Sequence, residues 1–197
     1  MLKIGSDFPN ITLTDIENNK ITIPNDINTK YCVLLFFRGA WWPKCTLQLD
    51  GYRKHRVLFE RLGASIFAAS VDSLDDTKLL ANGKCFPNRE KEMGFTLCYG
   101  VNQKIAKDLG AYWYDHEQGK NKYYYMGASN CNFSMDVGKI YFCCLTYSPA
   151  NTGAPVMTRI PKYWFESIYC VLLRVLLSNT NKDISNLDEN LYFHYPS

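Results

Sequence analysis

The stretch "YCVLLFFRGAWWPKCTLQL", residues 31–49, decides the fold of this chain. Its first seven residues, 31–37, are apolar without alternation, which predicts a central strand covered by helices on both faces. A short polar break follows, and the pattern then predicts a helix over about residues 45–62. Functional groups in open α/β sheets gather where a central strand ends, so the break itself is a candidate site.

The rest of the chain alternates between strand and helix patterns. Working outward, these patterns predict a hairpin over 11–24, strands over 65–71 and 95–99, helices over 74–82 and 102–110, a hairpin over 132–145 and a last helix over about 162–178. The segment 111–130 is polar and aromatic without a clear period, which predicts a long loop or insertion. This order predicts an α/β fold with a mixed central sheet, helices on both faces and an N-terminal hairpin.

Length and composition favour a single domain. The 197 residues, 47% of them hydrophobic, suffice for one core, which we assign to residues 1–178, with 179–197 as a loosely ordered C-terminal tail. The net charge of +3 is too small to indicate nucleic acid as a partner. The apolar runs fall short of the ~20 residues that cross a bilayer, and the N-terminus lacks the apolar region of a signal peptide. We therefore expect no membrane partner and a cytoplasmic location.

The cysteines argue against metal binding and structural disulfides. There are eight, at positions 32, 45, 85, 98, 131, 143, 144 and 170. None forms a Cys-x-x-Cys pair, the usual signature of a zinc ribbon or a dithiol redox loop. In a cytoplasmic protein a disulfide framework is not expected either.

Cys45 is the candidate for thiol chemistry. It lies at the predicted helix start, where free N–H groups favour a negative charge and lower the pKa of a thiol. Lys44 adjoins it, Arg38 lies seven residues before it, and Pro43 suits the turn that precedes a helix. Position alone leaves two interpretations open, a reactive thiolate or a buried, inert cysteine.

Four segments carry a resemblance to a known family. The segments "FFRGAWWPKCTLQL", "LGASIFAASVDSLDDTKLLA", "IAKDLGAY" and "FSMDVGKI" resemble successive blocks of the alkyl hydroperoxide reductase/thiol-specific antioxidant (AhpC/TSA) family, the peroxiredoxins and peroxiredoxin-like proteins. The resemblance spans roughly residues 5–145 and implies a thioredoxin-like fold. It places Cys45 on the cysteine that attacks peroxide and becomes a sulfenic acid, and Pro43 on the proline of the same loop.

The resemblance also implies how the cysteine is restored. A second thiol forms a disulfide with the oxidised cysteine, and an external reductant of the thioredoxin or glutathione type resets the protein. Cys131, before the last hairpin, is a candidate for this resolving thiol. No metal or organic cofactor is implied, and a homodimer is left open.

Two positions depart from the family pattern. Trp42 stands where the family has threonine or, in the nearest flavour, a first cysteine, and Asn130 stands near a family arginine. Arg38 could replace that arginine. Trp41 and Trp42 either pack over the end of the sheet or form a gate to Cys45.

These observations predict a peroxiredoxin-like antioxidant protein, a thiol peroxidase that reduces hydrogen or organic peroxides through Cys45. The alternative is a catalytically degenerate binding or scaffold module that uses its aromatic insertion. Thioredoxin-like disulfide exchange is disfavoured because Trp42 replaces the first cysteine.

Overall fold

A computed structural model describes residues 6–84, 92–111, 113–118, 121–126, 130–136 and 139–146. The predicted helix over 162–178 and the predicted domain boundary at 178 lie outside these residues. None of the helices in the described part is long and apolar enough to cross a membrane.

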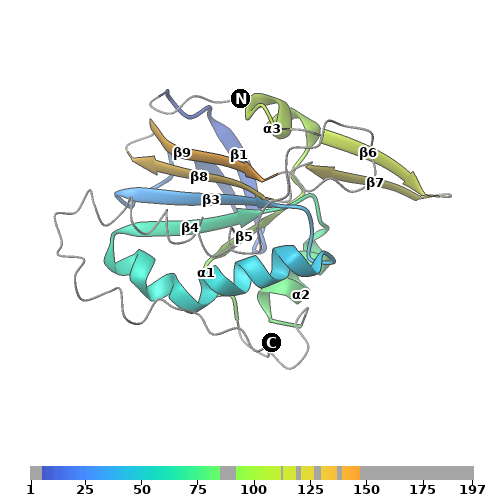
Figure 1. The fold of residues 1–197 in the computed structure, drawn as a ribbon, viewed down its shortest axis with the longest axis horizontal. Helices are drawn as coiled ribbons and strands as arrows, with labels where there is room; N and C mark the ends of the chain where they lie inside the picture. Colours follow the sequence, from blue (N-terminus) through green and yellow to red (C-terminus); the bar gives the residue numbers. More distant parts are fainter. Residues whose placement is uncertain are drawn as a thin grey trace. The chain divides into compact units, whose positions relative to one another are not determined.

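Strands and helices follow the predicted order in most of this region (Figure 1). The strands are β1 (Ile11–Asp15), β2 (Lys20–Ile23), β3 (Tyr31–Phe37), β4 (Ala64–Ala69), β5 (Thr96–Tyr99), β6 (Trp113–Gln118), β7 (Asn121–Met126), β8 (Asn130–Asp136) and β9 (Lys139–Thr146). The helices are α1 (Pro43–Arg61), α2 (Leu74–Ala81) and α3 (Gln103–Asp108).

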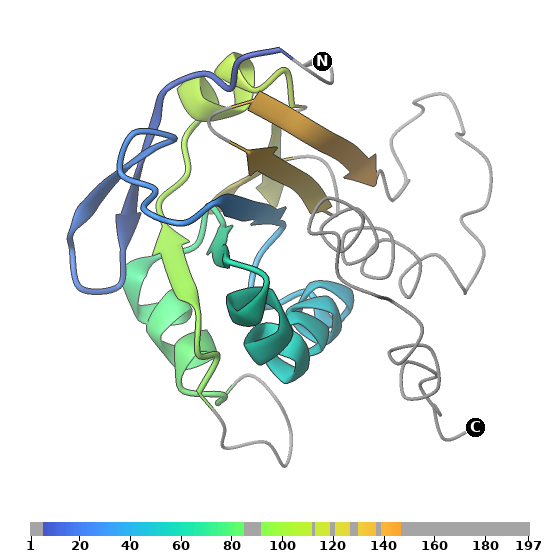
Figure 2. The ribbon, with the colours of Figure 1, turned by 90° about the vertical axis from the view of Figure 1, so that its left-hand side faces the viewer.

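Seven of these strands form one mixed sheet, in the order β2-β1-β5-β4-β3-β8-β9. Strands β3, β4 and β5 are parallel, whereas β1 joins β5 and β8 joins β3 in antiparallel fashion. Helices α1 and α2 cover one face of this sheet and α3 covers the other (Figure 2). The predicted mixed sheet with helices on both faces is therefore confirmed.

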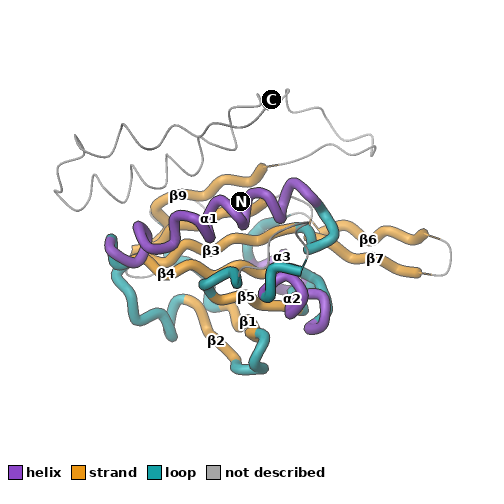
Figure 3. Tube along the Cα trace, turned by 90° about the horizontal axis from the view of Figure 1, so that it is seen from below, coloured by secondary structure: helices purple, strands orange, loops and turns teal. Residues whose placement is uncertain are grey.

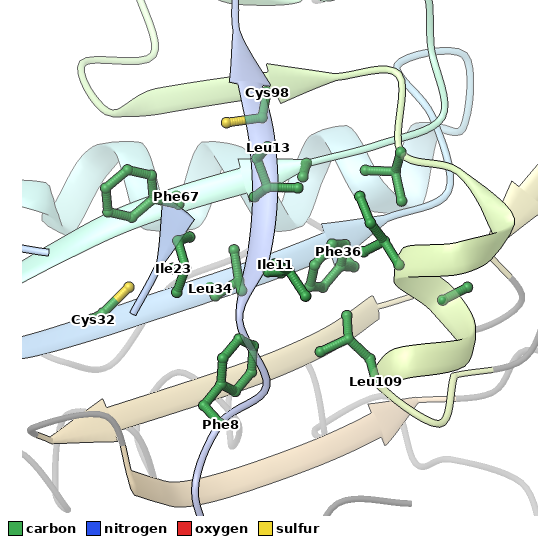
Figure 4. Close-up of a cluster of buried hydrophobic side chains, with 14 residues drawn as sticks. Phe8, Ile11, Leu13, Ile23, Cys32, Leu34, Phe36, Phe67, Cys98 and Leu109 are labelled. Atoms are coloured by element: carbon green, nitrogen blue, oxygen red, sulfur yellow. The ribbon is translucent and has the colours of Figure 1, made fainter. Parts of the chain in front are cut away.

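Strand β3 is the centre of the core because both of its faces are covered. All seven of its residues are buried, and its neighbours are β4 on one side and β8 on the other. Cys32, Leu34 and Phe36 belong to a buried cluster that includes Leu109 beside α3 (Figure 4). On the opposite face α1, which runs alongside β3 in Figure 3, buries its apolar side chains Leu49, Tyr52 and Phe59.

Side-chain caps fix the start of the two shorter helices, as the sequence predicts. The Ser73 hydroxyl accepts a hydrogen bond from the Asp76 N–H at 3.2 Å, and the Asn102 carbonyl oxygen accepts one from the Ile105 N–H at 3.1 Å. Each bond satisfies a backbone donor that the helix itself cannot pair.

Ser73→Ala should therefore lower the free energy of unfolding by about 1 kcal/mol, because it removes the cap of α2. Urea denaturation measures the change. Ser73→Asp, which keeps an acceptor at the cap, should retain most of the stability. An equal loss in both variants would contradict the role of the cap.

Two sequence predictions need correction. The first helix begins at Pro43 rather than Cys45, because proline suits the first helical position, where its missing N–H is not needed. The segment 111–130 is not a long loop, because β6 and β7 within it pair as a two-stranded antiparallel sheet, from Trp113 opposite Met126 to Gln118 opposite Asn121. Its many tyrosines favour strands, and two residues between the strands are typical of a hairpin.

Candidate active site

The loop between β3 and α1 places Cys45 in the first turn of the helix. Trp42 is the extended residue before the helix, with φ −95° and ψ 109°, and it makes no side-chain capping bond. Its carbonyl oxygen accepts hydrogen bonds from the N–H groups of Cys45 at 3.0 Å and Thr46 at 3.2 Å. Cys45 therefore lies at the start of the helix, as the sequence predicts.

Main-chain groups of the same loop contact the sulfur. The Cys45 sulfur accepts hydrogen bonds from the backbone N–H groups of Arg38 and Gly39. Donors of this kind stabilise a thiolate, and the positive charge of Arg38 acts in the same direction.

Burial outweighs these favourable contacts. The Cys45 side chain has an exposed fraction of 0%. Loss of hydration raises the pKa of the Cys45 thiol from 9.0 to about 11, with a smaller contribution from the negative charge of Asp72. The expectation of a lowered pKa is therefore wrong for this arrangement of the loop, because a helix start stabilises a thiolate less than complete burial destabilises it.

The side chain of Arg38 lies against both tryptophans. Its guanidinium carbon is 4.9 Å from the Trp41 ring centre and 4.7 Å from the Trp42 ring centre. The two rings meet edge to face, with centres 5.7 Å apart. Trp41 is 57% exposed, whereas Trp42 is half-buried. Cation–π contacts thus join the three side chains into one group in the loop that precedes Cys45.

Asp72 is a site residue that sequence reasoning missed. Its Oδ2 atom accepts a hydrogen bond from the Ala40 N–H at 2.7 Å, and only 9% of the residue is exposed. Burial raises the pKa of this carboxyl group, while the bonds from Ala40 and Ser70 oppose the rise. Asp72 follows β4, the parallel neighbour of β3, and the carboxyl ends of parallel strands meet at one edge of a sheet. That rule could have identified it.

The structure locates the remaining predicted residues by their backbone alone. Cys131 is opposite Phe36 and Asn130 is opposite Phe37, both in β8 at the end of β3. Cys131 is thus part of a strand and not of the loop before it. The side chains of Lys44, Asn130 and Cys131 lie outside the described part, and the resolving role of Cys131 stays a prediction.

No group of three or more His, Cys, Asp or Glu residues that could hold a metal ion occurs among the residues described. The groups that act on the sulfur are the backbone amides of Arg38 and Gly39, the Arg38 guanidinium and the Asp72 carboxyl group. This set can stabilise or restrain a negative charge on sulfur.

Comparison with known proteins identifies the family. The family model of AhpC/TSA matches residues 4–140. The chain belongs to the AhpC/TSA family. The family resemblance predicted from the sequence is thus confirmed.

Individual AhpC/TSA relatives are distant. Peroxiredoxin 1 of Picrophilus torridus is 34% identical over 71 residues, which cover 36% of this chain and 30% of that protein. Peroxiredoxin Bcp of Escherichia coli is 25% identical over 141 residues, which cover 71% of this chain and 83% of that protein. The first relative is therefore matched over less than a third of its own length.

Solved structures support the same fold. A mutant of Peroxiredoxin 6 of Arenicola marina superposes with a TM-score of 0.68 at 19% identity, covering 91% of this chain and 74% of that one. Peroxidoxin BcpB of Mycobacterium tuberculosis superposes with a TM-score of 0.66 at 16% identity, covering 93% and 100%. The AhpC/TSA chain therefore has the thioredoxin-like fold, as predicted.

Proposed function

We propose that this AhpC/TSA protein is a thiol peroxidase that reduces hydrogen or organic peroxides through Cys45. One observation carries the proposal, namely the two backbone N–H groups, of Arg38 and Gly39, that point at a sulfur in the first turn of α1. Both donors strengthen as the sulfur gains negative charge, so they favour the nucleophilic form.

The proposed reaction balances without a cofactor. The Cys45 sulfur attacks one oxygen of the peroxide, the O–O bond breaks, and the thiol becomes a sulfenic acid. The other oxygen leaves as water or an alcohol and takes up the thiol proton. A resolving thiol, for which Cys131 is the candidate, then reacts with the sulfenic acid to give a disulfide and water. Two equivalents of an external thiol reduce this disulfide to the two cysteine thiols and are themselves oxidised to a disulfide.

Burial sets the rate of this reaction. With a pKa of about 11, roughly one Cys45 thiol in 10⁴ is ionised at pH 7. Peroxide also needs a path to a side chain with an exposed fraction of 0%. We propose that Trp42, half-buried at the position directly before α1, acts as the gate, with its indole moving when peroxide enters.

The same burial favours a second candidate function. A sealed thiol with a raised pKa suits a degenerate module that binds a partner and performs no chemistry. In that case the thioredoxin-like domain would serve as a scaffold, with the hairpin β6–β7 in the place of the predicted aromatic insertion.

Oxidation measured at each cysteine separates the two functions. We expect dilute hydrogen peroxide to oxidise Cys45 well ahead of the other seven cysteines, as followed by mass spectrometry of peptides. Cys32 and Cys98 are internal controls, because both are buried and burial raises the pKa of each thiol to about 12. Slow and equal oxidation of all eight would refute the peroxidase and favour the scaffold.

Several features follow from the peroxidase proposal. The external reductant is a thiol of the thioredoxin or glutathione type, Cys131 is the candidate resolving thiol, and the protein works in the cytoplasm. A homodimer is the assembly that fits the family.

A further inference from the structure

Three successive backbone N–H groups of the β3–α1 loop donate hydrogen bonds to two ionisable side chains. The N–H groups of Arg38 and Gly39 donate to the Cys45 sulfur, and the next one, of Ala40, donates to the Asp72 carboxylate. Each acceptor is buried, with exposed fractions of 0% for Cys45 and 9% for Asp72. Consecutive main-chain donors of one loop thus bind both the thiol and the carboxyl group.

Asp72 is itself held firmly. Its N–H donates to the Ser70 hydroxyl at 3.2 Å, and its carbonyl oxygen accepts from the Gly100 N–H at 3.1 Å. Ser70 is tied to the same connection, because its carbonyl oxygen accepts from the Val101 N–H at 2.9 Å. The backbone of Ser70 and Asp72, which follows β4, is therefore anchored to the segment that follows β5, and the Asp72 carboxylate binds the Ala40 N–H from there.

The fit between Asp72 and the loop is tight. A side-chain carbon added at Gly39 would lie 2.8 Å from the Asp72 Oδ1 atom and 2.3 Å from the Trp41 Nε1 atom. Contacts this short do not occur in real side chains, so the position accepts only glycine unless its neighbours shift. Asp72 and Trp41 thus hold the donor residue Gly39 between them.

We propose that Asp72 is a positioning residue, which holds the loop of residues 38–40 against the Cys45 sulfur and restrains ionisation of that thiol by its negative charge. The inference rests on the proposed function only in that Cys45 is the reacting group. It adds a restraint on the reaction. Asp72 holds the loop whose N–H groups favour the thiolate of Cys45, and its own negative charge disfavours that thiolate.

The charges around the pair define this restraint. Arg38, at the end of β3, favours the Cys45 thiolate, whereas Asp72 opposes it. Asp76, in α2, disfavours the charge of Asp72 in turn. Two like charges cost free energy in a buried site, so removal of the carboxylate charge makes the thiolate easier to form.

The test is the pH dependence of Cys45 alkylation by iodoacetamide, followed at that residue by mass spectrometry. The wild-type midpoint should be about 11. Asp72→Asn removes the charge and keeps an oxygen for the Ala40 N–H. We expect its midpoint to fall by about half a unit to one unit, so that alkylation at pH 8 is about three- to tenfold faster, with an unchanged plateau rate at high pH.

Asp72→Ala separates positioning from charge. It removes the acceptor as well, so we expect the plateau rate to rise too, because the loosened loop exposes the sulfur. Asp75→Asn is the matched control, since Asp75 is an exposed acid in the first turn of α2, and it should behave as wild type.

Two results would overturn the inference. An unchanged midpoint in Asp72→Asn rules out the charge restraint. Fast hydrogen exchange of the Ala40 amide in the wild-type protein rules out the hydrogen bond to Asp72 as an anchor of the loop. This measurement needs no variant, so it can be made even if Asp72→Ala fails to fold. Neither result depends on peroxide turnover. Absence of turnover together with the expected alkylation shift would instead reject the peroxidase alone.

Discussion

Cys45→Ser is expected to abolish peroxide turnover, lowering it at least about 10³-fold to the background of the uncatalysed reaction. The hydroxyl oxygen of serine can accept hydrogen bonds from the same N–H groups of Arg38 and Gly39, so these donors keep an acceptor. A serine oxygen, however, cannot form the sulfenic acid on which the proposed cycle depends. Peroxide consumption in the presence of an excess of a small thiol measures the loss.

Cys98→Ser is the matched control for this prediction. Cys98 also has an exposed fraction of 0%, but it lies in the core cluster, away from the β3–α1 loop. The variant introduces the same hydroxyl at the same depth, so it tests the general effect of a buried polar atom. Its turnover should stay near that of the wild type. Equal activity in both serine variants would contradict the role assigned to Cys45.

Phe59→Ala is expected to cost the most stability, about 3–5 kcal/mol of the free energy of unfolding. Phe59 has an exposed fraction of 0%, and its ring centre is 5.8 Å from that of Tyr52 on the same helix. Truncation loses the buried apolar surface and leaves a cavity beneath α1. Urea denaturation, followed by far-ultraviolet circular dichroism, measures the change.

Val57→Ala is the control on the same helix. Val57 is 43% exposed, so its truncation leaves no cavity, and alanine favours a helix more than valine does. The free energy of unfolding should change by no more than about 0.5 kcal/mol. A similar large loss in both variants would contradict the assignment of the loss to buried packing, because truncation of an exposed and of a buried side chain on α1 would then cost the same.

The sequence predicted the centre of the fold well, because strong patterns coincide there. The apolar run 31–37 is β3 with the same bounds, since only a strand covered on both faces buries seven apolar residues in succession. The start of α2 was predicted equally well, because Ser73 and Asp76 form a local signal that needs no distant contact.

The predictions that failed depend on opposing effects of similar size, on contacts between residues distant in the sequence, or on weak sequence patterns. At Cys45 the sign of the pKa change depends on burial by distant segments, which position along the chain does not reveal. At Asp72 the decisive contact joins Ala40 across 32 positions of the sequence. In the segment 111–130 the lack of alternation hid a hairpin, although its tyrosines indicated strands.

The three main-chain donors of residues 38–40 affect which substitutions the sequence of this protein can accept during evolution. Every residue type except proline supplies the same N–H group, so side chains at 38 and 40 can be exchanged through evolution without removal of a donor. Gly39 is the exception, because its neighbours leave no room for a side chain. The path of the backbone is therefore the feature that evolution has to keep here, and the sequence around it can change while the sulfur keeps its main-chain donors.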